Sequence, residues 1–113
     1  MIEIYHNPRC GKSREGLQLL EKSGKGFKII KYLEETPNKQ NLEKIIKLLK
    51  IKPIELVRTN EKIWKENFKN SDHSDEELIE IMVKNPILIE RPIVINGNKA
   101  VIGRPPLKIL DIL

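Results

Sequence analysis

The first 33 residues carry the feature that most restricts the fold: two short apolar stretches with a helical stretch between them. Residues 2–6 alternate between apolar and polar side chains, which predicts a half-buried strand. Residues 27–33 predict a second strand, because they are rich in β-branched and aromatic side chains. The intervening helix has Leu17 and Leu20 on one face and ends at Gly24. This spacing is typical of two parallel strands joined by a helix.

The middle of the chain is predicted to be helical. Residues 36–38 open a helix whose apolar side chains recur at intervals of three and four residues: Leu42, Ile45, Ile46 and Leu49. A short turn follows at residues 53–57, and residues 64–68 predict another short helix. Ser74 with Glu77 three residues later is a capping box, so a third helix begins there and stops before Pro86.

The end of the chain has a different pattern. Residues 93–95 predict a strand, Gly97 lies in an Asn-Gly turn, and residues 100–102 return antiparallel to residues 93–95. Pro105 suits a helix start, and residues 107–113 predict a closing helix. The order of elements is therefore β-α-β, a helical block, and β-β-α.

This order predicts an α/β protein with a thioredoxin-like fold. Its four-stranded mixed sheet would come from the β-α-β and β-β-α halves, with the helical insertion between them. We expect a single domain over residues 1–113, because this length supports one hydrophobic core. In such a fold the residue before the third strand is usually a cis proline that faces the active thiol. The Arg91-Pro92 bond is therefore expected to be cis.

The composition excludes several classes of function. No apolar run approaches the roughly 20 residues that span a bilayer, and the N-terminus does not have the pattern of a signal peptide. We therefore expect a cytoplasmic protein with no membrane partner. The formal net charge of +5 allows an anionic partner, but nothing in the pattern of basic residues indicates a nucleic acid. Most lysines are expected simply to lie on solvated helix faces.

No metal site is expected. His6, His73 and Cys10 do not have the spacing of metal ligands, and His73 is expected to be an exposed loop residue before the Ser74 cap. No bound cofactor is predicted either.

The only cysteine, Cys10, lies between a strand end and a helix start. Unpaired backbone N–H groups and the positive end of the helix dipole favour a thiolate there. Arg9 and Lys12 add positive charge, and His6 adds more if its ring turns into the loop. Many cysteines are inert apolar side chains, but this polar loop favours a reactive thiol. Because no second cysteine exists, a thiol that resolves any adduct must come from outside the chain.

Three arginines lie in segments that can converge on this thiol: Arg58, Arg91 and Arg104. Guanidinium groups bind oxyanions through paired N–H bonds and stay charged at neutral pH. Together they would lower the pKa of the thiol and offset its repulsion from an anion. The alternative is that each is an ordinary surface residue.

The segments that carry these residues resemble the glutaredoxin-dependent arsenate reductases of the ArsC type, in order and in spacing. The matching segments are residues 4–14, 57–61, 85–94 and 103–105. The resemblance implies that Cys10 is the nucleophile and that His6 assists its thiolate electrostatically. It implies that the oxyanion is bound by Arg58, Arg91 and Arg104, and that Ser13 leaves a monothiol site.

The same resemblance implies a substrate and partners. The thiolate of Cys10 would attack arsenate to form a covalent adduct, and glutathione would displace that adduct with electron transfer to arsenic. Glutaredoxin would then clear the mixed disulfide as arsenite leaves. Arsenate is thus the expected substrate, glutathione the co-substrate and glutaredoxin the protein partner.

Two alternatives stay open. Spx-type regulators share this fold and bind RNA polymerase, and those that sense oxidants commonly use a Cys-x-x-Cys motif. Ser13 excludes such a disulfide switch here but does not exclude binding to polymerase. The other alternative is a glutathione-dependent thiol reductase with a non-arsenic substrate, in which the arginines would hold the carboxylates of glutathione.

Overall fold

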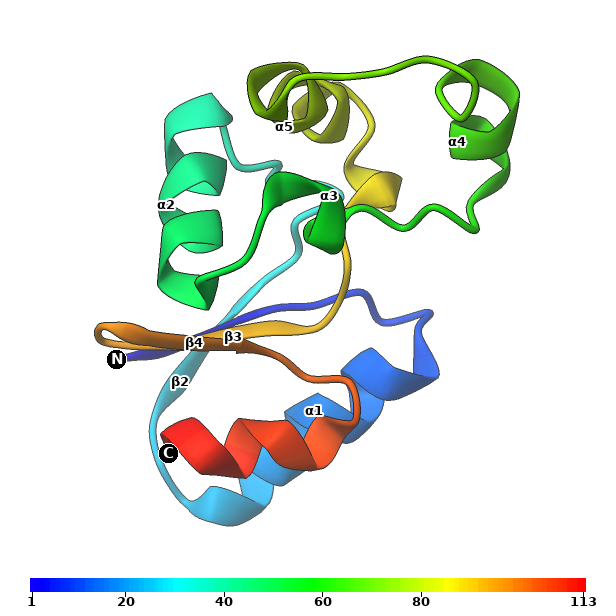
Figure 1. Cartoon of the computed structure of the whole chain (residues 1–113). Helices are drawn as coiled ribbons and strands as arrows, with labels where there is room; N and C mark the ends of the chain where they lie inside the picture. Colours follow the sequence, from blue (N-terminus) through cyan, green and yellow to red (C-terminus); the bar gives the residue numbers. More distant parts are fainter. The chain divides into compact units, whose positions relative to one another are not determined.

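The computed structural model describes all 113 residues and divides the chain into two compact units (Figure 1). The first unit joins residues 1–35 to residues 91–113, and the second contains residues 36–90. The second unit is therefore the helical insertion predicted between the two halves of the fold. None of the helices combines the length and the apolar character needed to cross a lipid bilayer.

A four-stranded mixed sheet forms the centre of the first unit, as predicted. Its strands are β1 (Ile2–Tyr5), β2 (Phe27–Ile30), β3 (Ile93–Asn96) and β4 (Lys99–Ile102), in the spatial order β2-β1-β3-β4. β1 runs parallel to β2, whereas β3 pairs antiparallel with both β1 and β4. The β-α-β and β-β-α halves thus meet where β1 pairs with β3.

The second strand is shorter than the sequence predicts, since it ends at Ile30 and not at residue 33. Its last ladder bond runs from the N–H of His6 to the carbonyl of Ile30, at 2.9 Å. Beyond that point the N–H groups of Glu34 and Glu35 both donate to the carbonyl of Lys31. The chain therefore turns as soon as β1 offers no further partner.

Two helices pack on one face of this sheet (Figure 1). α1 (Gly11–Ser23) ends, as predicted, at Gly24, which adopts the left-handed conformation with φ of 74°. η2 (Pro106–Ile112) is a 3-10 helix that begins one residue before the predicted closing helix. The two helices and the sheet share a core of aliphatic side chains: Ile2, Ile4, Leu20, Val94, Ile109 and Ile112.

Two glycines, Gly16 and Gly103, let the backbone pack closely against the Pro92 ring. A Cβ on Gly16 of α1 would lie 3.0 Å from Cγ of Pro92, and one on Gly103 would lie 2.9 Å from the same atom. Both would also crowd Cδ1 of Ile109, at 2.9 Å and 3.0 Å. Only glycine fits at these two positions without a shift of its neighbours. The Arg91-Pro92 bond is cis, as predicted, and the Arg104-Pro105 bond, for which we made no prediction, is cis as well.

The second unit is helical throughout. Its helices are α2 (Lys39–Leu49), α3 (Pro53–Leu56), α4 (Lys62–Asn67), α5 (Asp75–Lys84) and the 3-10 helix η1 (Pro86–Leu88). The predicted capping box is present at α5, where Ser74 Oγ accepts from the N–H of Glu77 at 3.1 Å and the Ser74 N–H donates to the Glu77 carboxylate at 2.8 Å. α5 packs against both α2 and α3 and contributes Leu78 and Met82 to the core of this unit.

One prediction about this unit was wrong. His73 was expected to be exposed, but its ring is half-buried and lies 5.7 Å from the ring of Trp64 and 5.9 Å from that of Phe68. Its Nε2 donates to the carbonyl of Phe68 at 2.9 Å. Two aromatic side chains four residues apart thus offer the imidazole a surface to pack on.

Candidate active site

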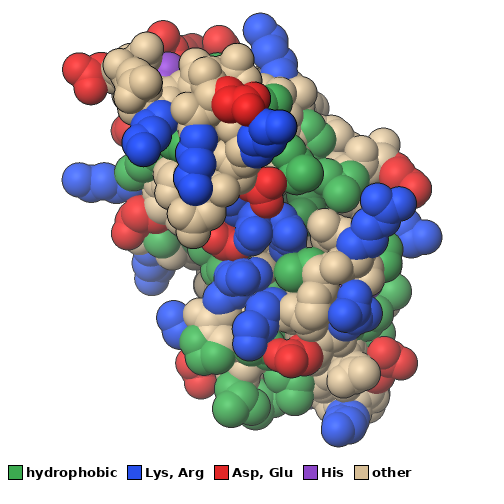
Figure 2. Space-filling view, turned by 90° about the vertical axis from the view of Figure 1, so that its right-hand side faces the viewer, with side chains coloured by type: hydrophobic (Ala, Val, Ile, Leu, Met, Phe, Trp, Pro, Cys, Tyr) green, Lys and Arg blue, Asp and Glu red, His purple; other side chains and the backbone are tan.

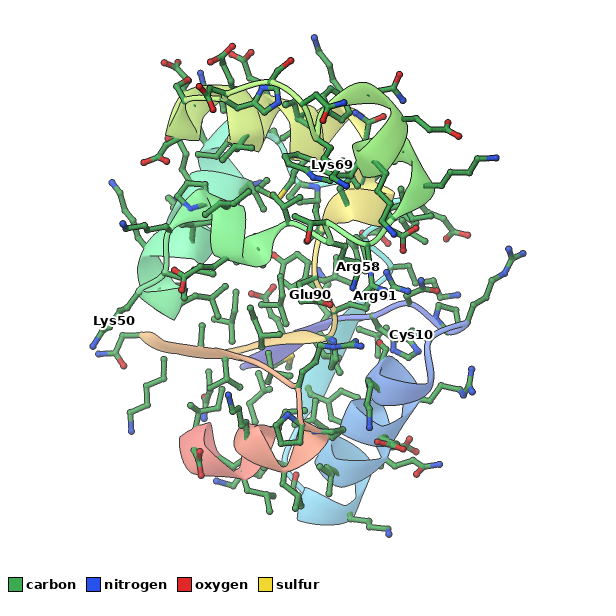
Figure 3. The ribbon with its side chains drawn as sticks, turned by 45° about the vertical axis from the view of Figure 1, so that its right-hand side comes forward. Cys10, Lys50, Arg58, Lys69, Glu90 and Arg91 are labelled. Atoms are coloured by element: carbon green, nitrogen blue, oxygen red, sulfur yellow. The ribbon has the colours of Figure 1, made fainter.

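Cys10 is the N-cap residue of α1 (Figure 3). Its backbone N–H donates to the carbonyl of Asn7 at 3.0 Å, and its carbonyl accepts from the N–H of Arg14 at 3.0 Å. The residue is 9% exposed, so its thiol is largely withdrawn from solvent but still reachable. The Cys10 side chain thus lies at the N-terminus of a 13-residue helix, where the backbone N–H groups and the helix dipole favour an anion.

Two of the predicted arginines lie at this thiol. Nη1 of Arg104 is 3.9 Å from Sγ of Cys10 and also donates to the carbonyl of Arg91 at 2.9 Å. Arg91 acts on the thiol both through a hydrogen bond and through its charge. A backbone hydrogen bond joins the residues next to these two arginines. The N–H of Gly103, which precedes Arg104, donates to the carbonyl of Pro92, which follows Arg91, at 2.8 Å.

The electrostatics of the site favour a thiolate. Burial by itself raises the pKa of the Cys10 thiol. The backbone amide of Ser13, followed by the guanidinium groups of Arg91 and Arg104, outweighs burial and brings this pKa to about 7. The direction is the one that the sequence predicts. The lowered pKa therefore favours the thiolate near neutral pH more than in a free cysteine.

The charges expected from the loop itself are not those that act on the thiol. Arg9 and Lys12 were expected to favour the thiolate, but both side chains are exposed, and Lys12 lies 3.8 Å from the carboxylate of Glu15. The groups that lower the pKa of Cys10 come instead from the first turn of α1 and from the segment around β3 and β4.

His6 contacts Ser13. Its Nδ1 lies 2.6 Å from Ser13 Oγ, and the same oxygen accepts from the backbone N–H of Asn7 at 3.0 Å. Burial lowers the pKa of His6, and the positive charge of Lys31 lowers it further. Burial and Lys31 thus favour the neutral ring, and the electrostatic assistance that the family resemblance implies for His6 stays a prediction. The contact of His6 also fixes Ser13, which is fully buried and whose amide acts on the sulfur.

The third predicted arginine, Arg58, belongs to the second unit and is paired with two carboxylates. Its Nε donates to Glu61 at 3.2 Å and its Nη1 to Glu90 at 2.6 Å (Figure 3 labels Arg58 and Glu90). Burial lowers the pKa of Arg58, but the two carboxylates outweigh burial and raise it. The structure thus brings Cys10, Arg91 and Arg104 together within the first unit, whereas the oxyanion role of Arg58 stays a prediction.

Sequence reasoning missed the residues that build the site without entering the chemistry. Asn7 is 7% exposed, and its Oδ1 accepts from the N–H of Arg9 at 3.0 Å, which shapes the turn before Cys10. Ser13 was noted only as the absence of a second cysteine, yet the hydrogen bond from its amide is the largest single effect that lowers the thiol pKa. Gly16 and Gly103 were not singled out, because the close approach of Pro92 depends on tertiary packing.

This arrangement suits nucleophilic attack on an anionic electrophile. In such a reaction the thiolate would be the attacking group, and the guanidinium groups of Arg91 and Arg104 supply donors and positive charge beside it. No group of three or more His, Cys, Asp or Glu side chains is placed to hold a metal ion. Figure 2 shows Lys and Arg side chains on the visible face, several of them near its centre, with Asp and Glu among them.

The chain is similar to proteins that are named arsenate reductases. The chain is 46% identical to the arsenate reductase of Haemophilus influenzae over 99% of this chain and 98% of that protein. It is also 46% identical to the uncharacterized protein YfgD of Escherichia coli K12, over 99% of this chain and 96% of that protein. The solved structure of the arsenate reductase from Vibrio cholerae superposes with a TM-score of 0.94 at 43% identity, covering 99% of this chain and 97% of that one. Residues 5–112 match the sequence pattern of the ArsC family, and the chain belongs to that family.

Proposed function

We propose that the protein is an arsenate reductase that uses Cys10 as its single nucleophile and draws its electrons from glutathione and glutaredoxin. The observation that carries the proposal is the Cys10 thiol itself. Its pKa is about 7, and Nη1 of Arg104 lies 3.9 Å from its sulfur. The names of the full-length relatives from Haemophilus influenzae and Vibrio cholerae support arsenate as the substrate.

The reaction begins with attack of the Cys10 thiolate on arsenic. A sulfur–arsenic bond forms, and one arsenate oxygen takes up protons and leaves as water. The thiolate of glutathione then attacks the Cys10 sulfur. A sulfur–sulfur bond forms, the electrons of the sulfur–arsenic bond stay on arsenic, and arsenite leaves with arsenic reduced by two electrons. A glutaredoxin thiolate takes over the glutathione from the mixed disulfide and frees Cys10.

In this mechanism the arginines offset the repulsion between the thiolate and the arsenate anion. Arg91 and Arg104 are assigned this role from their contacts with the thiol, and Arg58 from its match to the family motif. His6 is a positioning residue that holds Ser13 beside the thiol. The supply of thiol from outside fits a chain with one cysteine, and dependence on reduced glutathione fits the cytoplasm.

The test is arsenate-dependent oxidation of NADPH by the purified protein in a coupled system with glutathione, glutathione reductase and glutaredoxin. We expect turnover with the unmodified protein and none with Cys10→Ser. Omission of glutathione or of glutaredoxin should separately stop or slow the reaction. A protein that ignores arsenate in this assay would refute the proposal. Binding to RNA polymerase, or reduction of a glutathione mixed disulfide, would then favour one of the alternatives.

A further inference from the structure

A pocket of about 240 Å³ opens beside the loop that leads to Cys10, entirely within the first unit. Residues 6–9 form one wall, and the opposite wall comes from Lys31, Leu33 and Glu34. The walls are neighbours because the first segment follows β1 and the second follows β2, with Tyr5 paired to Ile30 in the parallel ladder. The pocket thus lies at the carboxyl edge of two parallel strands, beside the loop that leads to Cys10.

The walls of the pocket carry charges of both signs. Arg9 and Lys31 supply two positive charges, and Glu34 supplies one negative charge. The positive charge of Lys31 acts on His6, whose pKa it lowers in addition to the larger effect of burial. Leu33 and Pro8 add apolar surface between the charged groups. Such a lining suits an amino-acid zwitterion with an aliphatic stem, because the pocket offers both a carboxylate and cationic side chains.

The size of the pocket suits one end of a small peptide. Its volume of about 240 Å³ is smaller than the roughly 300 Å³ or more typical of sites that enclose a whole drug-sized ligand. The backbone distance from Asn7, which lines the pocket, to Cys10 is short, because three residues span at most about 11 Å even when extended. The hydrogen bond from the Cys10 N–H to the Asn7 carbonyl folds that stretch and shortens it further. The pocket and the Cys10 backbone are therefore within the reach of one small peptide.

We propose that this pocket holds the γ-glutamyl end of glutathione, an inference that rests on glutathione as the co-substrate in the proposed function. The α-carboxylate of that end pairs with Lys31 and Arg9, and its α-ammonium group pairs with Glu34. The side-chain methylenes lie on Leu33 and Pro8. The cysteinyl sulfur then points to the sulfur of Cys10, and the glycine end stays outside the pocket.

The experiment follows thiol–disulfide exchange and needs no arsenate. The Cys10 thiolate attacks one sulfur of oxidised glutathione, the sulfur–sulfur bond breaks, one glutathione thiolate leaves, and a mixed disulfide with Cys10 forms. The rate of its formation is measured by mass spectrometry for the unmodified protein and for Lys31→Glu. Hydroxyethyl disulfide, which is neutral and cannot use the pocket, reports any change in the thiol itself. Lys28→Glu is the matched control, because Lys28 is an exposed lysine of β2 that does not line the pocket.

We expect Lys31→Glu to slow exchange with oxidised glutathione by about 3- to 10-fold and to leave exchange with hydroxyethyl disulfide unchanged. Oxidised γ-glutamylcysteine, which keeps the γ-glutamyl end, should respond as glutathione does. Oxidised cysteinylglycine, which lacks that end, should not respond. Equal slowing of all four disulfides, no slowing of any, or an equal effect of Lys28→Glu would overturn the assignment. Since arsenate is absent, failure of the arsenate assay would refute the proposed function and leave this result intact.

Discussion

The arginines of the two units have different electrostatic surroundings. In the first unit, Nη1 of Arg104 faces the sulfur of Cys10 and a backbone carbonyl, and Arg91 stabilises the same thiolate. In the second unit, Arg58 donates to the carboxylates of Glu61 and Glu90. Arginines matched by one family motif therefore need not have equal surroundings. The first two act on the Cys10 thiol, whereas Arg58 is paired with two carboxylates of its own unit.

The largest difference between the first-unit arginines and Arg58 should appear when each arginine is replaced by alanine. Arg91→Ala and Arg104→Ala should each lower arsenate turnover by about 10- to 100-fold, since a charge-assisted contact contributes roughly 1.5–3 kcal/mol. Each should also raise the pKa of Cys10, because that pKa is held near 7 by these two groups together with Ser13. Kinetics in the coupled assay and a pH titration of the thiol measure the two effects.

Arg58→Ala is the contrasting variant. It should slow turnover if Arg58 binds the oxyanion, but it should leave the pKa of Cys10 unchanged, because the groups that lower this pKa lie in the first unit. Arg104→Lys should restore little activity, since an ammonium group cannot bridge two oxygens of one anion. An equal rise of the thiol pKa in all three alanine variants would remove the distinction between the units.

The packing that holds the first-unit arginines can be tested at Gly103, which lies directly before Arg104. Gly103→Ala would place a Cβ 2.9 Å from Cγ of Pro92. We expect a loss of about 1–3 kcal/mol in the free energy of unfolding and a fall of roughly 4 °C or more in Tm. The displaced Arg104 should also let the thiol pKa rise. Thermal melts measure the first effect.

Gly26→Ala is the control for this variant. A Cβ at Gly26 meets no atom within 4 Å, so the substitution should leave Tm unchanged or raise it slightly. If both alanine variants melted alike, close packing around Pro92 would not be what fixes the arginines.

The smallest effect is expected in the second unit, from Glu90→Gln. This change weakens the 2.6 Å contact with Arg58, whose side chain is 19% exposed. The free energy of unfolding should fall by about 0.5–2 kcal/mol. If Arg58 binds the oxyanion, its less compensated charge should lower KM for arsenate by about two- to fivefold.

Denaturant titrations and arsenate kinetics measure these two effects. Glu66→Gln is the matched control, because Glu66 forms only an exposed pair with Lys62 at 3.7 Å and should change neither quantity. An unchanged KM in Glu90→Gln would argue against an oxyanion role for Arg58.

Local chemistry explains which parts of the fold the sequence predicts. The capping box at Ser74, the left-handed Gly24 and the Asn-Gly hairpin at Gly97 depend on residues close together in the chain, and all are present. The position of Cys10 at the start of α1 also follows from local pattern. Strand length was less predictable, because β2 ends where its partner β1 ends and not where its own apolar residues end.

The details of the site depend on contacts between distant segments, which a sequence pattern does not reveal. His6 has the right type and place to act on the loop, but burial and Lys31 lower its pKa, and its ring contacts Ser13. Arg58 matches the motif, but Glu90, 32 residues away, occupies part of its guanidinium. Motif matching thus finds the residues of a site more readily than their protonation states.

The pH dependence of Cys10 tests the central claim most directly, because every thiol signal comes from the only cysteine of the chain. When the pKa of an acid is lowered, its anion persists to lower pH. The rate of alkylation by iodoacetamide should therefore rise with pH to a midpoint near 7 and be nearly flat above pH 8. Thiolate absorbance should follow the same curve. A midpoint at or above the free-thiol value of about 8.5 would contradict the claim that Ser13, Arg91 and Arg104 activate this cysteine.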